Sequence, residues 1–195
     1  MGKKRLEDAI KQIDQPIEVT YRAFELDPSA PRDIDLNVYE SLAKKYGMSV
    51  EQAKANTENM VQMAKEVGLE YNMDTLIQTN TFDAHRLAML AKKHDLMKEM
   101  TERILRAYFT DSKHIGDHET LTELAVEVGL DHEEVANMLA SDDMAEEVRS
   151  DEQQAHDYGI NGVPFFLINK KYAINGAQPT EAFVQALQKV IAEGE

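Results

Sequence analysis

Cysteine is absent from this sequence of 195 residues. Without a thiol, the chain as given can form no disulfide bond, no thiolate metal site and no cysteine nucleophile. The sequence also lacks any run of the roughly 18 apolar residues that a membrane-spanning helix needs. Its first residues, Met1–Asp8, are charged where a secretory signal peptide would become apolar. These absences predict a protein of the cytoplasm.

Positive charge is scarce. Lys and Arg total 21 against 36 Asp and Glu, which gives a net charge of −15. A surface of this sign repels nucleic-acid phosphates and anionic lipids, so neither is expected as a partner. Residues 35–158 hold 12 basic and 26 acidic side chains, whereas the remaining stretches hold 9 and 10. We therefore expect two parts of different character, residues 1–34 with 159–195 and residues 35–158.

Proline is missing between Leu36 and Tyr158, and apolar side chains recur there at intervals of three and four residues. Both features are typical of helices, and we expect about five to seven short ones. Ser49 and Thr81 are typical of helix starts, and Gly47 and Gly129 of helix ends. The pattern predicts an all-helical domain over residues 35–158.

The two ends of the chain have a different pattern. Apolar spacing predicts helices over residues 3–13 and from residue 180 onward. Alternation of apolar and polar residues predicts a strand over Ile17–Phe24. Residues 165–168 and 172–174 are predicted to form two strands joined by a tight turn. The order helix, strand, helical block, strand, turn, strand, helix indicates an α/β fold with a large helical insertion.

Five short segments, in this order along the chain, have distinctive sequences. They are Gly2–Glu7, Tyr21–Pro28, Asn80–Leu87, Gly159–Phe166 and Gly176–Pro179. Together they resemble the FrnE-like cytoplasmic branch of the DsbA class of thioredoxin-like proteins, in which a helical domain is inserted into a thioredoxin fold. The resemblance implies a thiol-disulfide oxidoreductase, similar to a disulfide isomerase, that acts on thiol- or disulfide-bearing proteins or peptides without a cofactor.

The same resemblance implies that the first strand and the redox cysteines of the family are missing from this chain. In that family a first strand leads into a Cys-Pro-x-Cys motif at the start of the first helix. An aromatic and an aliphatic residue follow the motif, and Met1 matches the aliphatic one. We therefore expect an N-terminally incomplete thioredoxin-like fold that is inactive in disulfide exchange. Lys3, Lys4 and Arg5 would then suit the stabilisation of a thiolate that this chain does not contain. Loss of the central strand would leave two unpaired edges, which either pair directly, 17–24 with 165–168, or are filled by a segment of a second copy. We expect the second outcome, which gives a homo-oligomer.

The resemblance also indicates candidate site residues. Val163-Pro164 matches the family's cis-proline dipeptide, in which the backbone of Val163 would bind an extended substrate peptide. His85, in the Asn-Thr-x-x-Ala-His-Arg segment, would border the same groove. Val163, Pro164 and His85 are therefore predicted to bind substrate, and no catalytic or metal-ligating residue is predicted in this chain.

Other interpretations remain open at this stage. A chain without thiols is compatible with a redox-dead module that binds a peptide or a protein partner. Two helix–turn–helix patterns, at residues 42–53 and 124–136, suit a DNA-binding protein, but their second helices lack the necessary Arg and Lys. His114 and His118 suggest a metal site, although the sequence indicates no third ligand. The ten methionines are spaced as core residues or as an adaptable binding surface.

Overall fold

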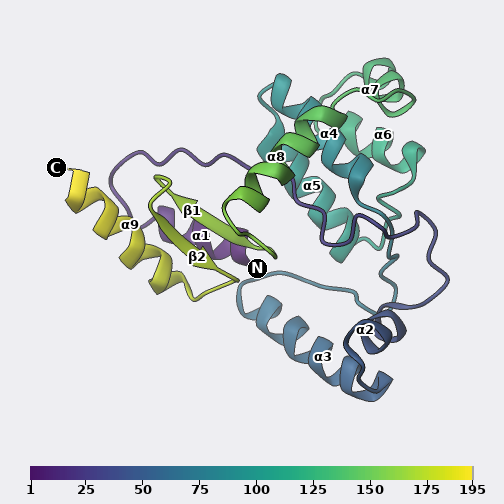
Figure 1. Cartoon of the computed structure of the whole chain (residues 1–195), viewed down its shortest axis with the longest axis horizontal. Helices are drawn as coiled ribbons and strands as arrows, with labels where there is room; N and C mark the ends of the chain where they lie inside the picture. Colours follow the sequence, from purple (N-terminus) through teal and green to yellow (C-terminus); the bar gives the residue numbers. More distant parts are fainter. Residues whose placement is uncertain (195) are drawn as a thin grey trace.

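The computed structural model describes residues 1–194, which form a small α/β part and a larger helical block (Figure 1). In chain order the elements are α1 (Gly2–Ile10), α2 (Val38–Tyr46), α3 (Val50–Glu66), α4 (Phe82–Lys93), α5 (Met97–Phe109), α6 (His118–Glu127), α7 (His132–Leu139), α8 (Ala145–Asp157), β1 (Phe165–Ile168), β2 (Tyr172–Asn175) and α9 (Thr180–Gly194).

The α/β part brings the two ends of the chain together. Helix α1 packs against α9, and Ala9 is fully buried against Phe183 and Leu187. The ring of Phe166 in β1 meets the ring of Phe183 edge to face, with 4.8 Å between centroids. One face of the hairpin therefore shares an apolar core with both helices. Burial of this apolar surface drives the packing of the three elements.

Strands β1 and β2 form an antiparallel pair with Phe165 opposite Asn175 and Ile168 opposite Tyr172. The turn between them places Asn169 and Lys170 at φ values of 48° and 55°, in the left-handed region. Two such residues are what a tight hairpin turn requires. The predicted hairpin is thus present at its predicted position.

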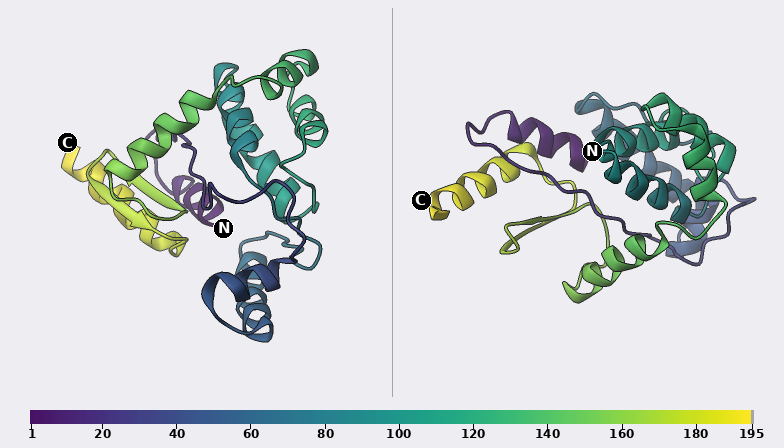
Figure 2. Two further views of the ribbon diagram at one scale, coloured as in Figure 1. Left: turned by 45° about the vertical axis from the view of Figure 1, so that its right-hand side comes forward. Right: turned by 90° about the horizontal axis from the view of Figure 1, so that it is seen from above.

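The helical block is built around α4. Seven residues of this helix are buried, and α5, α6, α7 and α8 all pack against it. Helices α2 and α3 pack mainly on each other and project as an arm in Figure 1 and in the left view of Figure 2. The block has seven helices, α2–α8, as the sequence pattern indicated.

Helix ends follow the predicted chemistry with one exception. Ser49 and Gln52 form a reciprocal capping box at the start of α3, and Gly47 ends α2 at a φ of 64°. At α4 the predicted cap, Thr81, makes no capping hydrogen bond. The side chain of Asn80 accepts the Phe82 N–H instead, at 2.8 Å.

The predicted strand over Ile17–Phe24 does not form within residues 1–194. The segment has no regular secondary structure, and the sheet contains β1 and β2 alone. A strand requires a neighbour with which to exchange backbone hydrogen bonds, and none of the described residues supplies one. The side chain of Asp151 in α8 holds the far end of the segment by accepting the Ala23 N–H at 2.9 Å.

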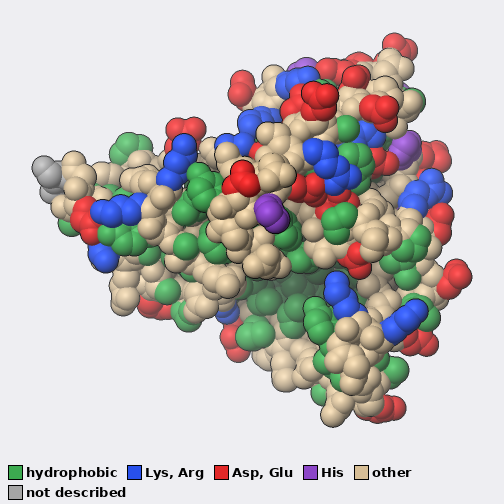
Figure 3. All heavy atoms as spheres, in the orientation of Figure 1, with side chains coloured by type: hydrophobic (Ala, Val, Ile, Leu, Met, Phe, Trp, Pro, Cys, Tyr) green, Lys and Arg blue, Asp and Glu red, His purple; other side chains and the backbone are tan. Residues whose placement is uncertain are grey.

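None of the helices in residues 1–194 is both long and apolar enough to cross a bilayer. On the face seen in Figure 3, acidic side chains are frequent over the helical block. Apolar side chains line a hollow at the centre of the same face. That hollow lies where the α/β part, the helical block and the α2–α3 arm meet.

Candidate functional site

The start of α1 lies directly against the loop that precedes β1. The Val163–Pro164 peptide bond in this loop is cis. A Cβ atom added to Gly2 would come within 2.8 Å of Pro164 Cγ and 3.0 Å of the Phe166 ring. Gly2 therefore allows the first turn of α1 to touch the proline ring, and a larger residue would push the two apart.

The backbone of Val163 is free to bind a ligand. Within residues 1–194 neither its N–H nor its C=O takes part in a hydrogen bond, and the residue is 46% exposed. Pro164, by contrast, is tied into the fold, because its C=O accepts the Gly176 N–H at 2.8 Å. A donor and an acceptor on one backbone residue are what an extended peptide needs in order to pair with it.

Tyr71 forms another wall of this junction. Its hydroxyl accepts a hydrogen bond from the Met1 amino group at 3.0 Å, and its ring stacks on Phe109 with 4.6 Å between centroids. Burial raises the pKa of the Tyr71 hydroxyl, with a smaller contribution from Glu102, so the group stays neutral at physiological pH. Sequence reasoning missed Tyr71 because it lies outside any helix or strand and belongs to none of the five recognisable segments.

The basic residues of α1 are already engaged. Lys3 and Lys4 each pair with a carboxylate four residues further along the helix, at 2.7 Å. Lys3 also contacts Glu102 of α5, and Arg5 donates to the carbonyl of Ala177. The expectation that these three side chains await a thiolate is therefore not supported by their contacts. They stabilise α1 and fasten it to the elements on either side.

Lys3 also has a perturbed acidity. Burial lowers the pKa of its ammonium group, but the hydrogen bonds to Glu102 and Glu7 outweigh this effect, and the net pKa is raised. The ammonium group is therefore charged throughout the physiological range. It links α1 of the α/β part to α5 of the helical block, one residue after Gly2.

His85 lies in a different environment. It faces the backbone of Phe24, with Glu152 and Asp151 of α8 nearby, and burial lowers the pKa of its imidazole. In the part of the chain that the structure describes, no hydrogen bond connects His85 with Val163 or Pro164. The structure therefore brings Val163 and Pro164 together with α1, while a role for His85 in substrate binding stays a prediction.

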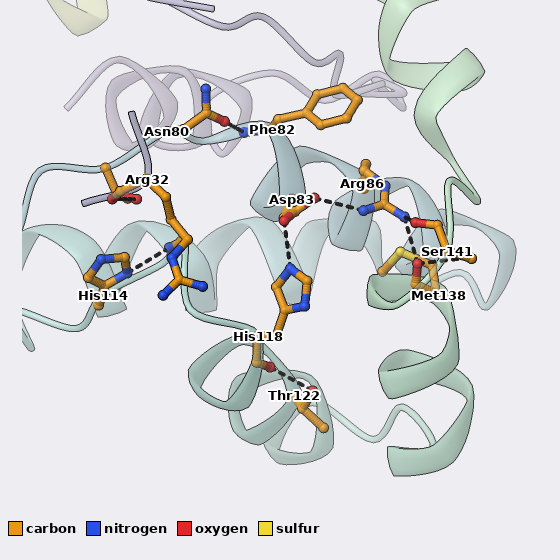
Figure 4. A network of polar contacts seen from close by, with 12 residues as sticks. Arg32, Asn80, Phe82, Asp83, Arg86, His114, His118, Thr122, Met138 and Ser141 are labelled. Carbon is orange, nitrogen blue, oxygen red and sulfur yellow. Dashed lines mark hydrogen bonds and ion pairs between the residues drawn. The ribbon is translucent and has the colours of Figure 1, made fainter. Parts of the chain in front are cut away.

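A second polar network lies inside the helical block (Figure 4). The buried guanidinium of Arg86 donates to the carboxylate of Asp83 at 2.7 Å and to the carbonyls of Met138, Ser141 and Asp143. The other oxygen of Asp83 is 2.7 Å from Nε2 of His118. These contacts satisfy the backbone between α7 and α8, so their role is structural.

The histidines that suggested a metal site do not converge. His114 lies 3.3 Å from Asp33, whereas His118 pairs with Asp83. Among residues 1–194, no three side chains of the types His, Cys, Asp and Glu are grouped as metal ligands.

The site is thus a junction of three parts: the N-terminal turn of α1, the cis Val163–Pro164 loop and Tyr71. Backbone N–H groups at a helix start stabilise a negative charge, and the Val163 backbone suits an extended peptide. Such a site can bind a polypeptide and stabilise an anion, but residues 1–194 place no thiol in it.

Comparisons with known proteins give consistent results. The profile of the family described as DSBA-like thioredoxin domain matches residues 1–188. The crystal structure of a probable DsbA oxidoreductase from Streptomyces coelicolor is 41% identical, with a TM-score of 0.94, and the match covers 98% of this chain and 84% of that one.

Two further proteins are more distantly similar. The cytosolic disulfide reductase DsbM from Pseudomonas aeruginosa is 16% identical, with a TM-score of 0.64 over 98% of this chain and 92% of that one, a likeness of fold. Uncharacterized protein YwbO from Bacillus subtilis (strain 168) is 29% identical over 189 residues, which is 96% of this chain and 88% of that protein.

Proposed function

We propose that this protein functions in thiol–disulfide exchange with protein or peptide substrates, at the junction of α1 and Val163–Pro164. The chain belongs to the DSBA-like thioredoxin domain family, a family of thiol-disulfide oxidoreductases with a thioredoxin-like fold. The chemistry requires a Cys-Pro-x-Cys segment immediately before α1. Residues 1–195 contain no cysteine and are proposed to be inactive by themselves.

The reaction follows from the chemistry of exchange. A thiolate at the start of α1 attacks one sulfur of a substrate disulfide, which forms a mixed disulfide and releases the other substrate sulfur as a thiolate. The second cysteine of the motif, as its thiolate, then attacks the mixed disulfide. This step frees the reduced substrate, which takes up protons from water, and leaves a disulfide in the motif. Electrons thus pass from the motif to the substrate.

This chain's own residues would position the reacting groups. Helix α1 would support the motif as the continuation of its own helix, and the N–H groups of the new N-terminal turn would favour a thiolate. The exposed backbone of Val163 binds the substrate on the side of the proline, and the Tyr71 hydroxyl supplies a neutral polar group in an otherwise apolar wall. The observation that carries the proposal is the contact of Gly2 with the cis Pro164 ring.

Several finer features belong to the same proposal. Residues 1–34 with 159–195 would form the thioredoxin-like domain and residues 35–158 the insertion. The core around Ala9, Phe183 and Leu187 supports this division, although Ala23 packs in the core of the helical block. The FrnE-like branch and a location in the cytoplasm are supported by the segments Gly2–Glu7 and Asn80–Leu87. Absence of the first strand is supported by the unpaired Ile17–Phe24 segment. A homo-oligomer remains a prediction.

A redox-dead binding module is the second candidate, because Val163 has a free backbone and the described chain has no thiol. One experiment separates the two. An apolar strand ending in Cys-Pro-Ala-Cys-Phe is fused before Met1, so that one aromatic residue separates the motif from Met1, and dithiothreitol-dependent reduction of insulin is followed by turbidity. We expect activity from this protein and none from the unextended chain or from the matched Ser-Pro-Ala-Ser extension. A folded but inert Cys-Pro-Ala-Cys protein would contradict exchange and favour the binding module.

A further inference from the structure

The hydroxyl group of Tyr71 lies at the start of α1. The segment that follows α3 passes beside the N-terminus in Figure 1 and in the left view of Figure 2. There the Tyr71 oxygen accepts a hydrogen bond from the Met1 nitrogen at 3.0 Å. The hydroxyl also has a proton to donate, and no acceptor for it is found among residues 1–194. An uncommitted donor therefore lies where the motif would join the chain.

The ring that carries this hydroxyl is fixed by packing. It stacks on Phe109 with 22° between the ring planes, and it packs in the apolar cluster of Val38, Met73 and Leu76. Burial raises the pKa of Tyr71, so the hydroxyl keeps its proton at physiological pH. Since the ring cannot swing away without losing these contacts, its O–H group stays at the start of α1.

Helix geometry indicates which group the hydroxyl would meet. With one aromatic residue between the motif and Met1, the two cysteines stand two and five positions before Met1. At about 1.5 Å per residue, they lie about 3 Å and about 7.5 Å further along the helix axis. The Tyr71 oxygen is 3.0 Å from the Met1 nitrogen, so the second cysteine is within its reach and the first is beyond it.

The extension also removes the hydrogen bond that the hydroxyl accepts now. Inside a longer helix the Met1 N–H donates to the carbonyl four residues earlier. The hydroxyl of Tyr71, which is partly buried, then needs another polar partner. A thiolate two positions before Met1 would meet this need as the acceptor of the Tyr71 proton.

We propose that Tyr71 is a catalytic residue, which donates a hydrogen bond to the thiolate of the second cysteine. The role rests on the proposed function and adds to its site a group from the helical block. In the second step of exchange this thiolate attacks the first cysteine's sulfur in the mixed disulfide. A bond forms between the two motif sulfurs, the bond to the substrate sulfur breaks, and that sulfur leaves as a thiolate. Tyr71 keeps its proton, and its hydrogen bond increases the fraction of the attacking cysteine that is ionised.

Charged groups near Met1 act on the same thiolate. Arg5 and Lys3 of α1 favour a negative charge there, whereas Glu102 of α5 opposes it. A comparison of variants must leave these three side chains in place, so that any change reports the hydroxyl alone.

Two substitutions meet this condition. Tyr71→Phe removes the hydroxyl and retains the stacked ring. Tyr108→Phe is the matched control, because it removes the same group from a neighbouring ring. That ring lies edge to face on Phe109, and within residues 1–194 its hydroxyl makes no hydrogen bond with α1.

The test uses a fused protein whose extension ends in Ser-Pro-Ala-Cys-Phe, so that the second cysteine of the motif is the only thiol. Its pKa is measured from the rate of alkylation by iodoacetamide between about pH 5 and about pH 10. We expect Tyr71→Phe to raise this pKa by about 0.5–1 unit, which lowers the thiolate fraction at pH 7 about three- to tenfold. Tyr108→Phe should leave the pKa unchanged.

A kinetic measurement with both cysteines present follows from the same reasoning. The mixed disulfide with a cysteine-containing peptide should resolve about two- to fourfold more slowly in Tyr71→Phe. This effect is smaller than the loss of thiolate because a thiolate of higher pKa is a stronger nucleophile.

An unchanged pKa in Tyr71→Phe, or an equal rise in Tyr108→Phe, would overturn the proposal. If Tyr71→Phe does not fold, ring-fluorinated tyrosine at position 71 replaces it. Its more acidic hydroxyl is a stronger donor and should lower the cysteine pKa, and the absence of a fall would overturn the proposal.

Insulin reduction separates this proposal from the proposed function. A Cys-Pro-Ala-Cys-Phe protein without activity, together with a raised pKa in Tyr71→Phe, would defeat the function and leave the hydrogen bond standing. Activity together with an unchanged pKa would do the reverse.

Discussion

Replacement of Asp151 by alanine tests how the extended segment 17–25 is held in place. The side chain is 6% exposed and makes two contacts with this segment. Oδ2 accepts the N–H of Ala23 at 2.9 Å, and Oδ1 accepts a hydrogen bond from Nη1 of Arg22 at 2.8 Å. Ala23 is 3% exposed, so the Asp151→Ala variant leaves a buried N–H without a partner.

The two contacts differ in expected energy. An unsatisfied buried N–H costs about 1–3 kcal/mol. The Arg22 side chain is 52% exposed, so solvent screening limits its ion pair to about 1 kcal/mol or less. Asp151→Ala should therefore reduce the free energy of unfolding by about 1–4 kcal/mol. At about 2–4 °C per kcal/mol for a chain of this size, Tm should fall by about 2–16 °C.

Differential scanning calorimetry with two companion variants separates the contributions. Asp151→Asn retains an oxygen that accepts the Ala23 N–H and should be less destabilised than Asp151→Ala. Arg22→Gln retains a donor but loses the charge, and should cost about 1 kcal/mol or less. If Arg22→Gln is as destabilised as Asp151→Ala, the ion pair dominates and the argument for a backbone anchor is refuted.

Three further predictions concern other parts of the structure. Arg86→Met removes the donors to a carboxylate and three carbonyls, of which that of Met138 is buried, and should destabilise the fold by about 3–5 kcal/mol in urea unfolding; a loss below 1 kcal/mol would contradict the network. Gly2→Ala should lower Tm through its clash with Pro164 despite better helix propensity, whereas Gly194→Ala, with no neighbour within 4 Å, should not; equal effects would contradict tight packing at Gly2. Because burial lowers the folded-state pKa of His85 below 6.5, its contribution to stability should be lost as pH falls from 6.5 through that lowered pKa, and His85→Gln should flatten this part of the stability profile; parallel profiles for the two proteins would refute it.

Local chemistry was predictable from the sequence wherever neighbours in the chain determine the structure. The capping box of Ser49 and Gln52 and the turn at Asn169 and Lys170 each involve residues within a few positions of one another. The resemblance added Val163-Pro164, whose peptide bond is cis in the structure.

The remainder depends on partners that are distant in the sequence. Alternation over Ile17–Phe24 indicates which side chains are buried, but it does not show whether a neighbouring strand exists. Tyr71 reaches the start of α1 across 70 positions. Lys3 was read as a group awaiting an anion because sequence spacing does not reveal Glu102, its partner in α5.

The central claim is that substrate binds where α1 meets the cis Val163–Pro164 loop. The most direct test uses the fused protein with Cys-Pro-Ala-Ser, so that a mixed disulfide with a cysteine-containing peptide accumulates. A photoreactive residue next to the peptide's cysteine is then activated, and the crosslinked position is mapped by mass spectrometry. We predict crosslinks to Val163 and to neighbouring residues of its loop. Crosslinks confined to the α2–α3 arm, with none at Val163, would contradict this location of the binding site.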